Sequence, residues 1–472
     1  MKLPDNFESY FRDRWESTTL DSLFQGLEEE SPVSIRLNPA RLPADALPEG
    51  ADGRVPWCPE GVYLRERPVF TADPLLHAGA YYVQEASSMF LAHVVRSLSD
   101  VLQPMLSAAH SSSPAALDLC AAPGGKSTLL RSLLPDECLL VANEPVRARA
   151  QVLAENLAKW GHPNVLVTQA HARDFAHFTE HHTAFGAGFG FILTDVPCSG
   201  EGMFRKEEEA LRQWSPAFVA ECAALQRSIL ADVWPALKPG GLLVYSTCTF
   251  NHLEDEENVE WICRELGAEV LEVDTDSSWG ITGHYHFLPD SVRGEGFFLS
   301  ALRKSGDEPL RSALGSRERR ARPVREQPFP SAMRSWVRGD FDYRVEDDLA
   351  LAFPSVHAGL RPLLRRHLHV LAEGVCIAEM RGCDWQPAHA LAMSQAYVRG
   401  TFPEAALTYD EALAYLRREA IQVDAPRGYV LVTFRDLPLG FVKNLGSRAN
   451  TLYPAEWRIR SGYATADPPC TI

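Results

Sequence analysis

Between residues 115 and 303, short apolar runs alternate with segments in which apolar residues recur at helical spacing. The runs read ALDLCA, CLLVANE, NVLVTQ, FGFILTDV and GGLLVYSTC, and each is about as long as a buried strand. The helical segments begin at Lys126, extend from Val146 to Trp160 and occupy the region near Pro216 to Leu237. Strands that are apolar on both faces and separated by helices predict a parallel sheet in an α/β fold.

The regions on either side show other patterns. The N-terminal region contains PVSIRLNP, from Pro32 to Pro39, and GAYYVQEASSMFLAHVV, which has helical spacing after Gln84. The stretch LSAAHSSSP, from Leu106 to Pro114, has the composition of a loop. Beyond Arg303, GVCIAEM and GYVLVTF indicate strands of smaller α+β modules.

These patterns divide the chain into five parts, with no internal repeat. We expect an N-terminal α+β cap at 1–105, a Rossmann-like core at 106–304, a basic linker at 305–328, a small α+β domain at 329–394 and a last α+β module at 395–472. A chain of 472 residues with 46% hydrophobic content is long enough for several such domains.

Composition narrows the class of protein. The first residues are charged, without an apolar signal region, and no window approaches the ~18 apolar residues that a membrane span requires. The 10 cysteines form no C-x-x-C motif, so neither a zinc ribbon nor a secreted disulfide framework is indicated. We therefore expect a cytoplasmic globular protein with free thiols and no membrane partner.

Charge is unevenly distributed along the chain. The net charge is -16, yet residues 301–472 carry 24 basic and 20 acidic residues, against 22 and 42 in residues 1–300. The most basic run is RSALGSRERRARPVRE, from Arg311 to Glu326. It is either a solvated linker or a stripe that contacts RNA phosphates, and composition fits both.

A glycine-rich turn follows the first predicted strand, in LDLCAAPGGKST from Leu117 to Thr128. It is not a phosphate-binding P-loop, because Cys120 replaces the required first glycine and Pro123 has no N–H to offer a phosphate. Glu144 ends the second strand about twenty residues on, where Rossmann-like folds place a ribose ligand. Together these features favour S-adenosylmethionine over ATP or NAD.

Three further candidates follow the fourth and fifth strands. Asp195 and Cys198 lie in TDVPCSGEGMFRK and Cys248 in YSTCTFN, so the carboxyl edge of a parallel sheet brings them together. The cysteines are either buried structural thiols or a reactive pair. A thiolate that adds to carbon 6 of cytosine activates carbon 5 for methylation, a second thiol can assist release, and Asp195 can hold the base. Lys126 either assists there or is a solvated lysine.

LDLCAAPGGKST, TDVPCSGEGMFRK and YSTCTFN resemble the motifs of RNA cytosine-C5 methyltransferases of the Nol/Nop/Sun type, and SIRLNP and YYVQEASSM extend the resemblance. SGEGMFRK and LGFVKNLGSRANTLYPAEWRIR are similar to the bacterial small-subunit ribosomal RNA methyltransferase F group. The resemblance implies a class I methyltransferase fold, S-adenosylmethionine as cofactor, Cys248 as nucleophile and Cys198 as the thiol for release. It also implies ribosomal RNA or the small ribosomal subunit as the partner, and we expect a monomer.

The cofactor site that follows from the turn and from this resemblance is a defined set of residues. Its members are Cys120, Ala121, Ala122, Pro123, Gly124, Gly125, Lys126, Glu144, His171, Asp174 and Asp195. The family usually has an acidic residue for the adenine where this chain has His171, in HARDF, so Asp174 or a backbone carbonyl is the alternative. A DNA cytosine methyltransferase and a non-catalytic ribosome-assembly factor are the competing interpretations.

The C-terminal residues resemble a PUA-like RNA-binding module. Its candidate RNA contacts are Lys443, Arg448, Tyr453, Trp457 and Arg458, although Trp457 equally fits a core position. His177 and His181 have the spacing of metal ligands on a helix, but no third ligand lies near them in the sequence. We therefore expect no metal site.

Overall fold

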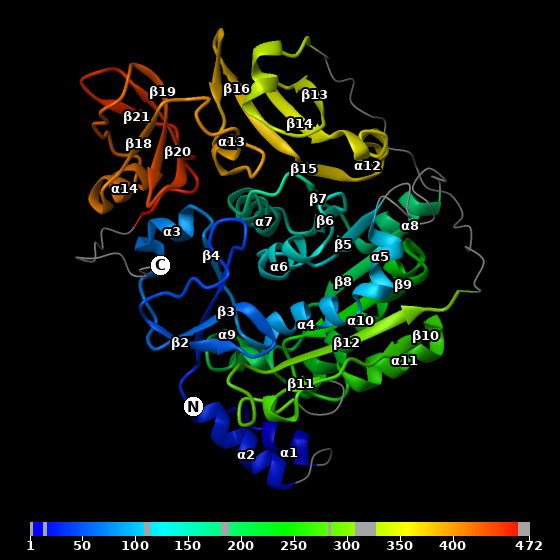
Figure 1. The fold of residues 1–472 in the computed structure, drawn as a ribbon. Helices are drawn as coiled ribbons and strands as arrows, with labels where there is room; N and C mark the ends of the chain where they lie inside the picture. Colours follow the sequence, from blue (N-terminus) through cyan, green and yellow to red (C-terminus); the bar gives the residue numbers. More distant parts are fainter. Residues whose placement is uncertain are drawn as a thin grey trace.

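The computed structural model describes residues 3–12, 17–107, 114–180, 188–281, 285–306 and 327–460. Its centre is a nine-stranded sheet in the order β10-β12-β9-β8-β5-β6-β7-β15, with β11 paired to β12 (Figure 1). The parallel strands are β5 (Ala115–Asp118), β6 (Leu139–Asn143), β7 (Val165–Gln169), β8 (Phe189–Asp195) and β9 (Leu237–Thr247). The antiparallel strands are β10 (Ala268–Leu271), β11 (His286–Phe287), β12 (Phe297–Lys304) and β15 (His369–Glu373).

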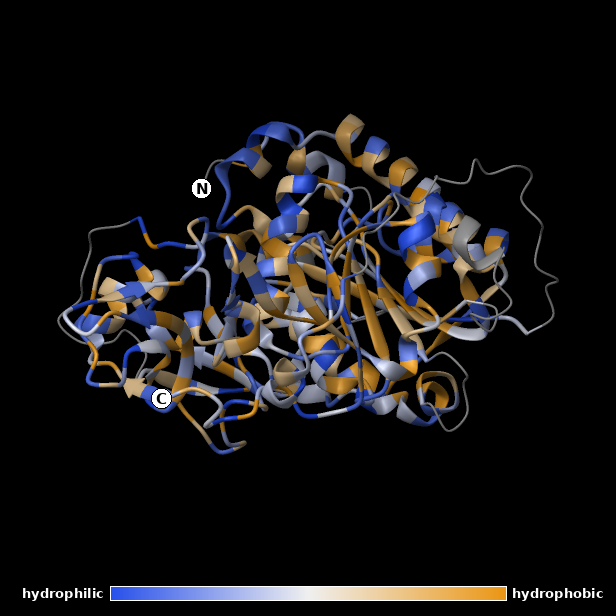
Figure 2. Ribbon diagram, turned by 90° about the horizontal axis from the view of Figure 1, so that it is seen from above, coloured by the Kyte–Doolittle hydropathy of each residue, from blue (hydrophilic) through white to orange (hydrophobic). Residues whose placement is uncertain are grey.

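Helices cover both faces of this sheet, and Figure 2 shows apolar strands enclosed between them. One face packs against α4 (Leu91–Ser97), α5 (Ser99–Leu106), α6 (Gly125–Leu133) and α7 (Arg147–Trp160). The other packs against α8 (Ala172–Glu180), α10 (Pro216–Val233), α11 (Glu256–Leu266) and α12 (Arg361–His367). None of the helices in the described part of the chain is long and apolar enough to cross a membrane.

Local sequence explains where the two longest of these helices begin or end. The Ser215 side chain accepts a hydrogen bond from the Phe218 N–H and Pro216 occupies the first turn, so α10 has a capped N-terminus. Gly161, with φ +86°, ends α7 in the left-handed conformation. The predicted segment from Val146 to Trp160 corresponds closely to α7, and β9 follows α10 after one short 3-10 turn.

The N-terminal region forms an antiparallel sheet in the order β2-β3-β1-β4, preceded by two helices. These elements are α1 (Phe7–Arg12), α2 (Ser17–Glu28), β1 (Val33–Leu37), β2 (Ala51–Val55), β3 (Cys58–Leu64), α3 (Pro74–His77) and β4 (Tyr81–Val83). The short helix α9 (Glu208–Gln213) lies between β8 and α10, and its neighbour Trp214 packs with Phe7 and Phe11 of α1. The cap therefore rests directly on the core.

Two further four-stranded sheets follow the core. The first contains β13 (Phe341–Glu346), β14 (Leu349–Pro354), β16 (Val375–Arg381) and β17 (Asp384–Pro387), followed by α13 (His389–Met393). The second contains β18 (Glu404–Ala406), β19 (Gly428–Phe434), β20 (Leu437–Asn444) and β21 (Ala449–Thr451), with α14 (Tyr409–Leu416). The predicted class, a Rossmann-like sheet with an N-terminal α+β cap and small C-terminal α+β modules, is confirmed.

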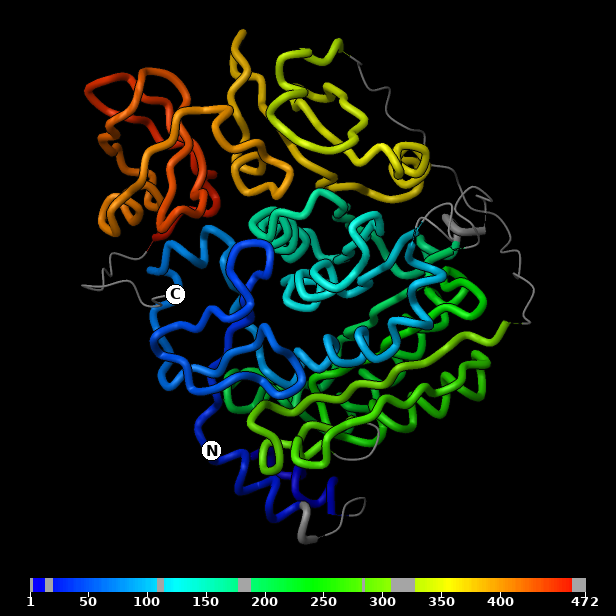
Figure 3. The backbone as a smooth tube through the Cα atoms, viewed as in Figure 1, coloured from blue at the N-terminus to red at the C-terminus, as the bar shows by residue number. Residues whose placement is uncertain are grey.

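The domains are joined more closely than the sequence indicates. Strand β15 lies between β14 and β16 in the chain but pairs with β7, so it extends the central sheet. The N-terminal sheet and the last sheet share one hydrophobic cluster that includes Ile35, Tyr81, Val430 and Tyr453. Figure 3 accordingly shows the last part of the chain beside the N-terminal domain. The basic run from Arg311 to Glu326 lies outside the described residues.

Candidate active site

The residues predicted to be catalytic lie together at the carboxyl ends of three neighbouring strands. Lys126 lies in the first turn of α6, which follows β5, and its Nζ lies 2.8 Å from Oδ2 of Asp195 at the end of β8. The Ser246 hydroxyl, on β9, donates to Asp195 Oδ1 at 2.8 Å. Burial by itself lowers the pKa of Lys126, but the Asp195 carboxylate raises it above its ordinary value overall, with a smaller contribution from Cys248. Lys126 is therefore held as a cation at this edge.

The two cysteines are in contact at the same edge. Cys198 and Cys248 are both partly buried, their Sγ atoms are 2.9 Å apart, and the Cys248 N–H donates to Cys198 Sγ at 3.3 Å. The hydrogen bond to Cys248, and then burial, raise the pKa of Cys198 well above its ordinary value. Phe297 of β12 is also close, because Lys126 Nζ lies 4.9 Å from its ring centroid. No sequence signal indicated Phe297.

The glycine-rich turn lies beside this group and is held from two sides. From α7, Arg149 donates to the Ala122 carbonyl at 3.0 Å and Asn156 to the Pro123 carbonyl at 2.8 Å. From β1, the buried Arg36 donates to the Gly125 carbonyl at 3.2 Å. Arg36 belongs to the SIRLNP motif, so that N-terminal motif fixes the start of α6.

Conformation and burial distinguish the residues of the turn. Gly124 has φ +117°, which disfavours a residue with a side chain. Ala121 and Ala122 are buried, Pro123 is exposed and Cys120 is partly buried. Burial raises the pKa of Cys120 above its ordinary range, so this thiol is uncharged.

The predicted ribose ligand, Glu144, directly follows β6 and is 1% exposed. Its Oε1 accepts the Val146 N–H at 2.9 Å, and its Oε2 lies 3.4 Å from the guanidinium of Arg149. Arg149 therefore connects the acid to the turn. Nothing in the sequence singled out Arg149, which is one of several basic residues in that helix.

Asp118, at the end of β5, is a polar residue that the sequence reasoning did not select. It is fully buried, Oδ2 accepts the Ser127 hydroxyl at 2.6 Å, and Oδ1 has no hydrogen-bond partner. Burial raises its pKa to about 7. A buried oxygen without a partner at a strand end is a feature of a ligand site. Its position in LDLCAAPGGKST was the available signal.

The two adenine candidates lie after β7. His171 is exposed, and Asp174 Oδ2 accepts the His171 backbone N–H at 2.9 Å. This contact is one half of a capping box at the start of α8. The Asp174 carboxylate thus has a structural contact, and the structure brings neither side chain into the thiol group. His181 and the side chain of His177 lie outside the described residues.

Two buried carboxylates lie next to the thiols. Glu201 and Glu254 are both 0% exposed and share hydrogen-bond donors. Burial, and then Glu201, raise the pKa of Glu254 to about 7, and burial raises that of Glu201. Their positions in SGEGMFRK and after YSTCTFN gave no sign that they meet in space.

A second acidic cluster lies at the start of α11. Asp255, Glu256 and His286 each offer a ligand atom, and these atoms lie within 4.8 Å of one another. Glu256 accepts hydrogen bonds from His286 at 2.5 Å and His252 at 2.9 Å, while Thr247 donates to Asp255 at 2.6 Å. Burial alone raises the pKa of Glu256, but the two histidines lower it overall. These contacts describe a hydrogen-bonded cluster, which the sequence reasoning missed.

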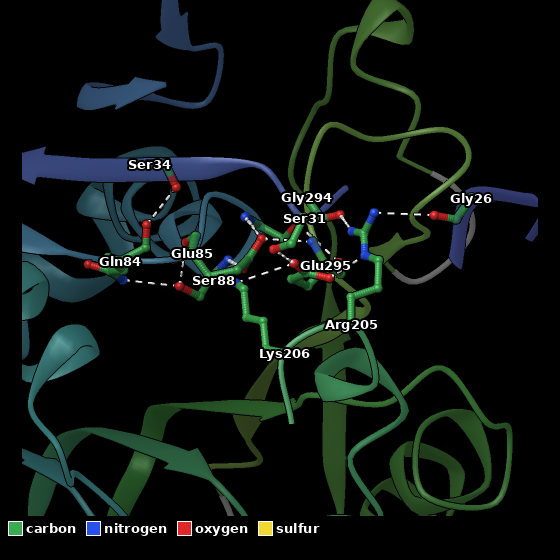
Figure 4. A network of polar contacts seen from close by, with 11 residues as sticks. Gly26, Ser31, Ser34, Gln84, Glu85, Ser88, Arg205, Lys206, Gly294 and Glu295 are labelled. Atoms are coloured by element: carbon green, nitrogen blue, oxygen red, sulfur yellow. Dashed lines mark hydrogen bonds and ion pairs between the residues drawn. The ribbon is translucent and has the colours of Figure 1, made fainter. Parts of the chain in front are cut away.

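The seam between the cap and the core is also polar. The carboxylate of Glu295, a residue that is 3% exposed, lies 2.7 Å from Nε of Arg205 and 3.3 Å from Nζ of Lys206 (Figure 4). Beside it, Glu85 accepts the backbone N–H groups of Ser88 and Glu295. The motifs YYVQEASSM and SGEGMFRK, far apart in the sequence, therefore meet here. This seam fixes the cap to the core.

The predicted RNA contacts of the last module fall into two groups. Lys443, Arg448 and Arg458 are exposed, as that prediction requires. Tyr453 is 1% exposed and packs with His389 and Tyr415, so the prediction that it stacks on a base is wrong. Trp457 is partly buried, 5.1 Å from the His389 ring, which places it against the core.

Family models match three parts of the chain. Residues 105–303 match the 16S rRNA methyltransferase RsmB/F family, residues 3–86 the N-terminal domain of 16S rRNA methyltransferase RsmF, and residues 402–459 the methyltransferase RsmF PUA domain. The last match confirms the prediction of a PUA-like module.

Curated relatives extend the likeness over the whole chain. Ribosomal RNA small subunit methyltransferase F of Cronobacter sakazakii is 32% identical over 99% of this chain and 98% of its own length. The protein of the same name from Klebsiella pneumoniae is 33% identical over 85% of this chain and 84% of its own. A solved structure titled as NSun6 from Pyrococcus horikoshii with SFG shares the fold, with a TM-score of 0.50 and 20% identity over 64% of this chain and 99% of that one. The chain belongs to the ribosomal RNA small subunit methyltransferase F family.

Proposed function

We propose that this chain transfers a methyl group from S-adenosylmethionine to carbon 5 of cytosine in small-subunit (16S) ribosomal RNA. The observation that carries the proposal is the contact between the Cys198 and Cys248 sulfurs, 2.9 Å apart beside the Lys126–Asp195 ion pair. The names of the relatives support the class of RNA substrate. The two-thiol arrangement supports the cytosine chemistry.

The chemistry requires covalent activation, because carbon 5 of cytosine is a poor nucleophile. The Cys248 thiolate adds to carbon 6, and the electron pair of the C5–C6 double bond moves to carbon 5, which takes the methyl group. Carbon 5 then carries the methyl group and its original hydrogen. A base removes that hydrogen as a proton, the double bond forms again, and the bond between carbon 6 and sulfur breaks.

The likeness of the motifs to those of RNA cytosine-C5 methyltransferases supports this division of roles. It assigns attack to the thiol of YSTCTFN, Cys248, and release to the thiol of TDVPCSGEGMFRK, Cys198. The two Sγ atoms are 2.9 Å apart, so Cys198 lies beside the sulfur that carries the base. Once Cys248 is a thioether, Cys198 can lose its proton to solvent and act as the base at carbon 5.

Asp195 and Lys126 act on the cytosine ring and not on the two thiols. The Asp195 carboxylate accepts a hydrogen bond from the cytosine amino group, and Lys126, 2.8 Å away, balances the charge that develops in the ring. S-adenosylmethionine supplies the methyl sulfonium. In this proposal the turn from Cys120 to Gly125, Glu144 and the unpartnered Oδ1 of Asp118 bind its polar groups, and His171 or Asp174 meets the adenine.

The other domains hold the RNA in this proposal. The cap at 1–105 and the last module at 395–472 contact the RNA backbone, and the core at 106–304 acts on one base. The exposed Lys443, Arg448 and Arg458 are phosphate contacts of this kind. The enzyme acts as a monomer in the cytoplasm, on ribosomal RNA or the small subunit.

A methyl-transfer assay with bisulfite mapping tests the proposal. Wild-type protein, S-adenosylmethionine and 16S rRNA or small subunits from a strain that lacks the enzyme should yield bisulfite-resistant cytosine. Cys248→Ala should yield none, although it still binds the cofactor. Methylation at another atom of the base, equal activity of Cys248→Ala, or preference for DNA would each contradict the proposal.

A further inference from the structure

The polypeptide on either side of Cys198 is tied to one buried carboxylate, that of Glu254. Ser199, which follows Cys198, donates its backbone N–H to Glu254 Oε2 at 3.1 Å and its hydroxyl to Oε1. Gln226 of α10 donates to Glu254 Oε2 at 2.6 Å and to the Pro197 carbonyl at 2.9 Å. Glu254 thus fixes the residue after Cys198 directly and the residue before it through Gln226.

The same carboxylate fixes the chain that follows Cys248. Asn251 donates its side-chain amide to Glu254 Oε1 at 2.8 Å, and its Oδ1 accepts the Glu254 backbone N–H at 3.0 Å. The Gly202 N–H donates to the Cys248 carbonyl at 2.9 Å, which joins the two loops a second time. The spacing of the two sulfurs therefore depends on contacts that converge on Glu254.

The surroundings of Glu254 allow little alternative geometry. Its side chain is fully buried, and Glu201 lies in the same group with Ser199 and Asn251 as common donors. No lysine or arginine forms an ion pair with Glu254 or Glu201 in the part of the chain that the structure describes. Four neutral donor groups thus bind the Glu254 carboxyl. A network of this kind loses its geometry when one member is removed.

We propose that Glu254 is a positioning residue for the release step: it holds Cys198 against Cys248, within reach of carbon 5 of the adduct. The inference rests on the proposed function, because it concerns the thiol pair assigned there. Cys248 directly follows β9, which holds it in place without Glu254, whereas Cys198 lies three residues beyond β8 in a loop that Glu254 fixes on both sides. Attack uses the Cys248 sulfur, and release needs the Cys198 sulfur at a second, defined point. A loosened loop around Cys198 therefore impairs release more than attack.

The experiment compares Glu254→Ala with Ser199→Ala, which removes a single side-chain partner of Glu254. The control is Glu257→Ala, an exposed acid in the first turn of α11, three residues after Glu254. Each full-length protein is incubated with S-adenosylmethionine and rRNA and run on a denaturing gel to measure RNA-linked protein. A misplacement of ~1 Å can slow a positioned step by ~10²-fold, so release in Glu254→Ala should slow by roughly 10- to 100-fold.

Glu254→Ala should therefore accumulate RNA-linked protein, Ser199→Ala should accumulate less, and Glu257→Ala should match wild type. Cofactor affinity should stay within about twofold in all three, since Glu254 is remote from the ribose ligand Glu144 in the chain and in its contacts. A folded Glu254→Ala that turns over normally, or that loses transfer without any linked RNA, would overturn the inference. If Glu254→Ala does not fold, the absence of linked RNA in Ser199→Ala overturns it.

The Cys198→Ala variant separates this inference from the proposed function. If Cys198→Ala accumulates linked RNA and Glu254→Ala does not, the positioning role is wrong and the proposed chemistry stands. If Cys198→Ala accumulates none, the proposed chemistry itself is wrong.

Discussion

The carboxyl edge of the central sheet and the junction between the cap and the last module both contain polar side chains, which differ in burial and in partners. At the sheet edge, Lys126 and Asp195 are ion-paired but remain partly exposed, with side-chain exposures of 15% and 32%. At the junction, Tyr453 and His389 are enclosed by other rings, 5.1 Å from centroid to centroid. At the edge the polar groups remain partly open to solvent, whereas at the junction they are packed between domains.

The difference suggests that the sheet edge determines activity and that the junction determines the stability of the fold. Substitutions at the edge should change cofactor binding and methyl transfer while the protein remains folded. Substitutions at the junction should change the free energy of unfolding, because the last module and the cap share one hydrophobic cluster there.

Tyr453→Ala should produce the largest loss of stability, because truncation of a buried aromatic side chain costs about 3–5 kcal/mol. Urea unfolding measures it. Tyr453→Phe should lose only about 1 kcal/mol, since it removes the hydroxyl that contacts His77 at 3.2 Å and keeps the ring. If Tyr453→Ala has the free energy of unfolding of wild type but binds RNA more weakly, Tyr453 stacks on a base after all.

Glu144→Ala should weaken S-adenosylmethionine binding by about 1–3 kcal/mol, the loss expected when a charged hydrogen-bond partner is removed. Titration calorimetry measures the affinity. Glu260→Ala, an exposed acid on α11, is the control and should bind like wild type. Equal affinity for Glu144→Ala and wild type would place Glu144 outside the cofactor site.

Acid should destabilise the junction through His389. Burial, and then Lys159, lower the pKa of His389 to about 3, below the ~6.5 of an unfolded histidine. The unfolded chain therefore binds the extra proton between these values, and stability falls as the pH drops below ~6.5, by about 1.4 kcal/mol per pH unit. In His389→Leu the free energy of unfolding should change less with pH, because the contribution of His389 is removed. Urea unfolding at pH ~6.5 and ~5.5 measures this difference.

His369→Asn provides the control for this pH dependence, because His369 is exposed on β15. Its slope should equal that of wild type. Parallel pH dependence of wild type and His389→Leu would mean that His389 is not held neutral at the junction.

The smallest effect concerns exposed charges of the last module. Lys443→Gln and Arg448→Gln should each reduce the slope of log binding constant against log salt by about one, as removal of a phosphate contact does. Filter binding to rRNA at several salt concentrations measures the slope. The control is Arg264→Gln, at an exposed position on α11, which should leave the slope unchanged. If Lys443→Gln and Arg448→Gln also leave the slope unchanged, RNA does not contact this face of the last module.

The sequence predicted the location of a residue correctly where the strand order of the fold alone determines that location. Asp195, Cys198 and Cys248 follow parallel strands, and the ends of such strands meet at one edge whatever the loops contain. The same rule applied to Asp118, whose unpartnered oxygen is visible only in the structure. The strand pattern therefore predicted the fold of the core and most of the candidate site.

Contacts between domains could not be predicted from the sequence. The pairing of β15 with β7 joins residues about two hundred positions apart, and an apolar run does not state its partner. Tyr453 was misassigned because an aromatic residue near basic residues fits a core as well as an RNA surface. The convergence on Glu254 depends on loop conformation, which neither hydrophobic period nor motif spacing specifies.

Covalent trapping on rRNA distinguishes the roles of Cys198 and Cys248. Wild type, Cys198→Ala, Cys248→Ala and the double variant are incubated with S-adenosylmethionine and rRNA and separated by denaturing electrophoresis. Cys198→Ala should remain attached to RNA, because Cys248 still attacks while release stalls, and neither Cys248→Ala nor the double variant should attach. RNA-linked protein from Cys248→Ala with Cys198 intact would reverse the two roles, and normal turnover by both single variants would contradict the covalent mechanism.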